Sequence, residues 1–393
     1  MVVALFQIIE ELKVKKLIGM SLMAAALMMS SAPVVFADFQ AGMAASKLGD
    51  YVTALREWKP LAEQGHVGAE FNLGVMHHNG QGVARNFEKA VKWYRKAAEQ
   101  GHVQAQYNLG VMLGKGRGVA QNYEEAAKWY RKAAKQKFAA AQYNLAVKYD
   151  KGQGVAQDYK EAAKWYRKAA EQEFADAQSN LGIMYDTGVG VVQNYKKAVK
   201  WYRKAAEQGH DQAQLNLGMS YSFGKGVAQS YKEAVNWFRK AAAQGNQQSQ
   251  YNLGVMYEKG RGVAQDYTEA MKWYRVPAKL GMAFAQNNLA QLYNFGRGVA
   301  QDYKEAAKWY RKAAEQGVAD AQQNLGYKYD MGQGVLHDEV MAYMWYNLAG
   351  ANGSKMGAEN RAIIESSMTS RQVAEAQRLA MECMKKNYKE CGR

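Results

Sequence analysis

The sequence predicts an all-α protein that folds as an α/α superhelical solenoid of helix hairpins. Internal repetition is the first of three observations behind this prediction, because all nine tryptophans fall into one register. They are Trp58, Trp93, Trp129, Trp165, Trp201, Trp237, Trp273, Trp309 and Trp345, and after a first step of 35 every step is 36. A leucine column from Leu73 to Leu325 and an alanine column from Ala90 to Ala342 keep the same period. Repeats of this length indicate stacked supersecondary units.

Composition excludes several classes of protein. The chain has 393 residues, of which 48% are hydrophobic, with only three prolines and two cysteines. Disordered and collagen-like chains contain more proline or less apolar surface, and disulfide-built chains need more cysteine. The net charge of +16 raises the question of an anionic partner.

Residues 1–37 have the parts of a secretory signal peptide. Lys13, Lys15 and Lys16 precede an apolar run over 17–35, and small residues precede a predicted cleavage after Ala37. Two alternatives stay open: an uncleaved membrane anchor, since about 20 apolar residues span a bilayer, and a translation start at Val14. A cleaved mature chain is expected to be exported to an oxidising compartment.

Residues 38–65 are interpreted as a shorter opening repeat. Tyr51, Ala54, Trp58 and Gly65 match the second half of the repeat that follows.

Eight full repeats of 36 residues then occupy 66–353, and each is predicted to be a helix hairpin. In the first, Ala69, Leu73 and Met76 have helical spacing, and a second periodic segment begins near Ala90. The intervening G-x-G sequence marks the turn.

Each predicted second helix has a start signal and a stop signal. The residues expected to cap its first turn are Asn86, Asn122, Asp158, Asn194, Ser230, Asp266, Asp302 and Asp338. Five copies add a glutamate three residues later, which predicts a capping-box-like pair. Glycine at the C-terminal end predicts positive φ, and Lys137 and Glu173 replace it in two copies.

Small residues near the middle of each first helix are expected to let another backbone approach. Gly74 is the first of this column, and Ala146 and Ala290 replace glycine in two copies.

Residues 354–393 depart from the period and are predicted to form C-terminal capping helices. Thr369 and Gln372 predict a capping box. Cys383 and Cys391 are too far apart for a disulfide on one continuous helix, so a bridge requires the chain to turn back near Asn387. An internal bridge, two free thiols and an intermolecular bridge all stay open.

The repeat resembles the Sel1-like repeat, a relative of the tetratricopeptide repeat. The copy over 246–281 carries Leu253-Gly254, Tyr257, Gly260 and Trp273-Tyr274-Arg275, and the closing sequence is similar to that of bacterial members. The resemblance implies a TPR-like superhelix that serves as a scaffold or adaptor for other proteins, with no shared catalytic residue set. Together with the predicted signal peptide, the similarity to bacterial members leads us to expect a periplasmic or secreted location.

The sequence offers no specific catalytic, cofactor or metal site. A dinucleotide-binding G-x-G sequence follows a strand, whereas these pairs follow helices. His77 and His78 are adjacent, which is not a spacing that brings two side chains to one metal on a helix. We therefore expect no enzyme activity, no cofactor, no metal and no nucleic-acid partner.

One polar column is complete in all eight repeats and is the candidate peptide-binding ladder: Asn72, Asn108, Asn144, Asn180, Asn216, Asn252, Asn288 and Asn324. Asparagine is unfavourable inside helices, so its retention needs a reason. The structural interpretation is a hydrogen bond between adjacent hairpins. The functional interpretation is that amides on the concave face grip an extended peptide beside variable neighbours.

The functional prediction is an exported scaffold that binds protein or peptide partners through the concave face of the solenoid. The alternative is a basic protein that binds an anionic envelope polymer or membrane, and the third is a cell-envelope enzyme. Partner, pathway and oligomeric state do not follow from the sequence.

Overall fold

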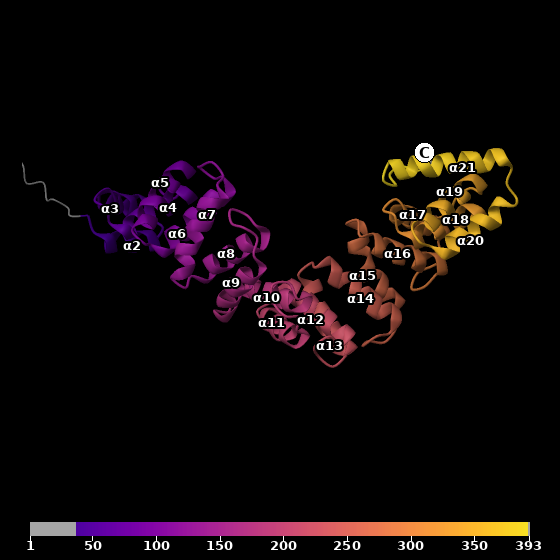
Figure 1. Cartoon of the computed structure of the whole chain (residues 1–393), viewed down its shortest axis with the longest axis horizontal. Coiled ribbons are helices and arrows are strands. Elements are labelled where there is room, and N and C mark those ends of the chain that lie inside the picture. Colours follow the sequence, from indigo (N-terminus) through magenta and orange to yellow (C-terminus); the bar gives the residue numbers. More distant parts are fainter. Residues whose placement is uncertain (1–36, 392–393) are drawn as a thin grey trace, which may run out of the picture. The chain divides into compact units, whose positions relative to one another are not determined.

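The computed structural model describes residues 37–391, which contain helices and turns and no strand (Figure 1). The all-α prediction is confirmed. The predicted signal peptide lies outside the described residues except for Ala37. Within the described range, no helix is both long enough and apolar enough to cross a bilayer.

The described chain divides into two compact units, residues 37–136 and residues 137–391. The helices of the first unit are α2 (Phe39–Lys47), α3 (Tyr51–Glu63), α4 (Val67–Asn79), α5 (Phe87–Glu99), α6 (Val103–Lys115) and α7 (Tyr123–Lys135). The second unit begins with α8 (Ala139–Lys151), α9 (Tyr159–Glu171), α10 (Ala175–Thr187), α11 (Tyr195–Glu207), α12 (Asp211–Phe223), α13 (Tyr231–Ala243) and α14 (Gln247–Lys259). It continues with α15 (Tyr267–Lys279), α16 (Ala283–Phe295), α17 (Tyr303–Ala314), α18 (Ala319–Met331), α19 (Glu339–Ala351), α20 (Lys355–Glu365) and α21 (Ser370–Lys385).

Within each unit, every helix packs against the helix that follows it, apart from α20, and the hairpins stack in chain order. We call the even-numbered helices α4 to α18 the first helices and the odd-numbered helices α5 to α19 the second helices. The opening segment forms its own hairpin from α2 and α3, and both α20 and α21 pack on α19 at the other end.

Buried leucine, alanine and tyrosine columns fill the core. Leu73 on a first helix is 1% exposed and Tyr94 on a second helix is 2% exposed. The expected reason for the glycine column holds only in part. A Cβ atom on Gly74 would lie 2.5 Å from the ring of Tyr94, so the glycine admits an aromatic ring first; at Gly218 and Gly326 a backbone carbonyl of the second helix also comes within 3.2–3.3 Å of the added atom.

The tryptophan column is only partly a core column. Trp345 is completely buried, but Trp93, Trp165, Trp201 and Trp273 keep part of their surface exposed. In six of the nine copies a lysine three residues later covers the ring, as at Trp165, where the Lys168 Nζ lies 4.1 Å from the ring centroid. Five of the nine tryptophans are buried and four are half-exposed, so the column forms the edge of the core, where a cation–π contact accompanies most rings.

The predicted helix starts are confirmed, because all eight second-helix caps accept a hydrogen bond from a backbone N–H of the first turn. The predicted stops are confirmed too, and even the two residues that replace glycine, Lys137 and Glu173, have φ of 65° and 62°.

The glutamates after these caps behave differently from the prediction. Glu161 forms an ion pair with Lys164 at 2.5 Å instead of closing a capping box. The reciprocal capping box predicted at Thr369 and Gln372 is present at the start of α21.

The C-terminal segment keeps the period for one helix longer than predicted. Asn360 on α20 lies 36 residues after Asn324, and its side chain forms a hydrogen bond with Tyr346 on α19. Asparagines of earlier first helices form the same bond with the tyrosine of the preceding second helix. After α21 the chain turns back through Asn387 and Tyr388, both at positive φ. Cys383 and Cys391 form a disulfide across this turn, with their Cα atoms 4.9 Å apart.

Candidate functional site

The asparagine column lies along the first helices. Seven of its eight side chains are half-buried, and Asn252 is 9% exposed. Each amide therefore has one part inside the protein and, in most copies, another part accessible from outside.

The inner part of these amides contacts the preceding hairpin. The Asn288 Nδ2 on α16 donates to the hydroxyl of Tyr274 on α15 at 3.1 Å. Asn108 makes the same contact with Tyr94, and Asn180 makes it with Tyr166. Burial raises the pKa of Tyr94 to about 12, so this hydroxyl stays protonated at physiological pH. These contacts favour the structural interpretation of the column without removing the outward amide surface.

One hairpin lacks the tyrosine hydroxyl, because Phe238 occupies that position. Its neighbour Asn252 instead donates to the Met219 sulfur at 3.3 Å and accepts from the amide of Gln248 at 3.3 Å. The asparagine is thus retained where its usual partner is missing.

In the second unit, four of the six residues that lie six positions after an asparagine of the column are acidic. Asp186, Glu258 and Asp330 accept hydrogen bonds from the buried tyrosine of their own hairpin, at 3.4, 2.5 and 3.2 Å. Asp150 occupies the same column, and burial raises the pKa of its carboxyl. Acidic groups consequently line the first helices of a chain whose net charge is positive.

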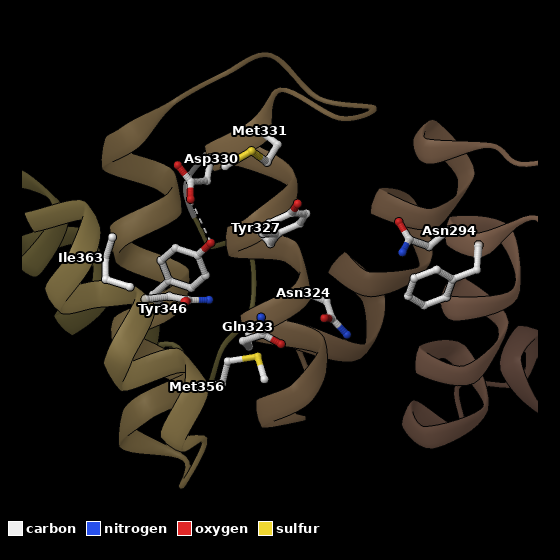
Figure 2. Close-up of a pocket in the computed structure, with 11 residues that line it drawn as sticks. Asn294, Gln323, Asn324, Tyr327, Asp330, Met331, Tyr346, Met356 and Ile363 are labelled. Carbon is white, nitrogen blue, oxygen red and sulfur yellow. Dashed lines mark hydrogen bonds between the residues drawn. The ribbon is translucent and has the colours of Figure 1, made fainter. Parts of the chain in front are cut away.

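Two cavities open beside the asparagines of the second unit. The larger, which we call the α18–α20 pocket, has a volume of about 570 Å³. Its lining residues are Asn294, Phe295, Gln323, Asn324, Tyr327, Asp330, Met331, Tyr346, Met356, Asn360 and Ile363. Figure 2 shows Asn324 and Tyr327 on α18, with residues of α20 to one side and Asn294 of α16 to the other. A smaller cavity of about 210 Å³ contains Asn216 and the exposed ring of Phe223.

A family model for the Sel1 repeat matches eight consecutive segments of this chain. They are residues 67–102, 103–138, 139–174, 175–210, 211–246, 247–281, 283–318 and 319–354. The chain belongs to the Sel1 repeat family. Sel1 repeats generally mediate protein–protein interactions and are typically non-enzymatic.

Solved structures include close relatives of these Sel1 repeats. A Sel1 repeat protein from Oxalobacter formigenes is 34% identical over 78% of this chain and 88% of its own, with a TM-score of 0.60. A protective antigen of uropathogenic Escherichia coli strains, described as displaying an SLR fold, is 35% identical. That likeness covers 86% of this chain and 88% of the antigen, with a TM-score of 0.47. No curated protein sequence matches the chain.

A second amide column in the Sel1 repeats escaped the sequence reasoning. Gln214 is 4% exposed, and its Nε2 donates to the Ala206 carbonyl of the preceding second helix at 3.1 Å. Its Oε1 accepts from Gln244 at the end of its own hairpin at 2.9 Å. The same chain of contacts recurs at Gln178 with Gln208. A glutamine two residues before the asparagine in seven repeats was the available signal.

The histidines of the Sel1 repeats have structural roles. His66, His102 and His210 cap first helices, because the Nδ1 of each accepts a backbone N–H three residues later at 3.1–3.2 Å. His77 and His78 are half-buried, and burial lowers the pKa of both rings. Over residues 37–391, no cluster of three or more His, Cys, Asp or Glu side chains forms a potential metal site.

Proposed function

We propose that this Sel1 repeat protein is an exported scaffold that binds protein or peptide partners along the face formed by its first helices. The observation that supports it most is the repeated amide column, half-exposed beside side chains that change from repeat to repeat. Amides carry both a donor and an acceptor, so a row of them suits the backbone of an extended chain. The two cavities on this face provide places for side chains of the partner.

Export is the second part of the proposal, supported by the basic and apolar parts of residues 1–37. Sequencing the N-terminus of the protein recovered from the periplasm or the medium should give a start at Asp38. Recovery of the intact N-terminus in the membrane fraction would support the anchor instead.

The scaffold is tested by replacing Asn144, Asn180 and Asn216 with alanine in the mature chain. Partners are first captured with the wild-type chain by brief crosslinking in its own compartment, washed at low and high salt, and identified by mass spectrometry. Affinity for a captured protein should fall in the triple variant. The matched control is Tyr166→Phe, which removes the hydroxyl that contacts Asn180 but keeps the amide.

The control separates the two roles of the column. If the triple variant melts at a lower temperature yet binds its partner unchanged, the asparagines serve structure alone. If the triple variant loses binding while the Tyr166→Phe protein keeps it, the exposed amides contribute directly.

A second candidate, binding to an anionic envelope polymer or membrane, is favoured by exposed lysines on the second helices. Lys160, Lys164 and Lys168 on α9 are all exposed, and α17 repeats the pattern at Lys304, Lys308 and Lys312. Such contacts weaken as salt screens them. Capture of polymer or lipid alone, lost in the high-salt wash, would favour this candidate over the scaffold.

A further inference from the structure

We propose that the α18–α20 pocket binds one large apolar side chain of an extended peptide that has a basic residue next to it. The inference rests on the proposed scaffold function and names the chemistry of its partner at one end of the chain. The volume of the pocket, about 570 Å³, lies within the range of about 300–1,000 Å³ that is typical of ligand sites.

The apolar character of this pocket arises because consecutive repeats place apolar residues side by side. Seven residues after the asparagine, three other repeats carry Lys115, Lys151 and Lys259 and one carries Phe223, whereas both consecutive repeats at this end carry an apolar residue, Phe295 and Met331. Three residues after the asparagine, where four repeats have valine, α18 has Tyr327 and α20, one period later, has Ile363.

These apolar side chains are exposed rather than packed into the core. Met356 and Phe295 are each 58% exposed, Met331 is 50% exposed, and Ile363 is 69% exposed. An exposed apolar group bordered by polar residues is typical of an interaction site. Burying a large partner side chain among them would remove apolar surface on both sides from water.

Amides are available for the backbone of the bound peptide. Asn324 and Asn360 line the pocket as successive members of the asparagine column. Asn294 also lines the pocket, and its Oδ1 is buried without a hydrogen-bond partner among the described residues. Buried polar atoms usually have such a partner.

The charge of the lining sets the preference for a basic neighbour. Asp330 is the only charged residue among those that line the pocket, and its carboxylate is oriented by the Tyr346 hydroxyl at 3.2 Å (Figure 2). An apolar setting with one carboxylate attracts a lysine or arginine and disfavours an acidic residue.

The test is selection of peptides from a displayed library of random linear sequences, of about a dozen residues each, on the immobilised mature chain. The variants are Met331→Lys and Phe295→Lys, which introduce the residue that other repeats have at this position and should therefore fold. Val192→Lys is the matched control, because Val192 is an equally apolar, 88% exposed residue outside the pocket.

Peptides with a large apolar residue beside lysine or arginine should be enriched on the wild-type chain and on the Val192→Lys protein. Binding of a synthetic peptide from that group should fall about tenfold or more in either pocket variant, as expected for losing the burial of one large side chain. Asp330→Asn, which copies Asn294, should remove the preference for the basic residue but keep the apolar one.

The outcomes separate this inference from the scaffold proposal. Enriched peptides that bind the pocket variants and the wild-type chain equally, or that carry acidic residues, overturn the pocket assignment and leave the scaffold standing. Failure to enrich any peptide on the wild-type chain counts against both.

Discussion

Replacing Gln214 with leucine should destabilise the protein far more than the same change at Gln250. Gln214 is buried and makes two hydrogen bonds, at 3.1 Å to the Ala206 carbonyl and at 2.9 Å from Gln244. Gln250 makes one long bond of 3.4 Å to Ala242, and its buried Oε1 has no partner among the described residues. The difference arises because Leu280 stands where other repeats have the donating glutamine.

The magnitude follows from counting these contacts. Each buried hydrogen bond contributes about 1 kcal/mol net, and a buried polar group left unpaired costs about 1–3 kcal/mol. Both partners keep another bond, because the Ala206 carbonyl also accepts from the Gly209 N–H and Gln244 also donates to the Gly209 carbonyl. Losing both bonds at Gln214 should therefore cost about 1–3 kcal/mol. Gln250→Leu loses a weak bond but also removes an unpaired oxygen, so its cost should be about 0–1 kcal/mol.

Urea unfolding followed by circular dichroism measures the global effect. Hydrogen exchange of α11 to α14 measures the local effect, which is needed because repeat arrays do not always unfold in one step. Equal destabilisation by the two substitutions would refute the idea that the glutamine column holds adjacent hairpins together.

Three further predictions follow from buried groups. Lys328→Met should raise the free energy of unfolding by about 1–2 kcal/mol at pH 7, because Lys328 is 2% exposed and burial lowers its pKa to about 8 from the usual 10.5, a cost larger than the loss of its contacts with Gln333 and the Tyr303 ring. Below pH 8 this lysine is charged in both the folded and the unfolded chain, and the burial cost is complete. Between pH 8 and 10.5 the folded chain loses the proton first, so the gain measured by urea unfolding should shrink; a pH-independent gain would contradict this cause. Tyr274→Phe should lower the free energy of unfolding by about 1–2 kcal/mol, since the Tyr274 hydroxyl is hydrogen-bonded to both Glu258 and Asn288. An unchanged midpoint of urea unfolding would show that these bonds do not contribute to stability. Reducing the bridge between Cys383 and Cys391 should destabilise the C-terminal turn by about 2–3 kcal/mol, seen as faster hydrogen exchange in α21 only; unchanged exchange would mean that packing alone holds the turn.

The features that sequence could predict are those determined by local residue types. Asn86 caps a helix because its side chain reaches an N–H three residues away, and Gly80 ends one because it adopts φ of 77°. The 36-residue period then extends each local rule to every repeat. For this reason the hairpins and their limits were predicted accurately.

The features that sequence could not predict depend on contacts between residues far apart in the chain. Gln214 and Gln244 are 30 residues apart, and nothing in either local sequence identifies the other as its partner. The period places Gly74 at a helix crossing, but only the structure shows that Tyr94 fills the space above it. The same limit applies to the α18–α20 pocket, which needs side chains from four helices.

The two amide columns together explain how one surface can combine structure and binding. Positions two residues apart on a helix are rotated by about 200° around its axis. The glutamine and the asparagine of each first helix therefore point to nearly opposite sides. The glutamines are consequently enclosed between hairpins, where both ends of the amide are used, while most asparagines are only half-buried. Because the glutamine column already joins the hairpins, the asparagines need not be retained for stacking alone. Asn252, beside Phe238, is the buried exception, and its amide is held by Met219 and Gln248. The argument for a partner therefore rests on the other seven asparagines, whose amides are half-exposed beside side chains that change from repeat to repeat.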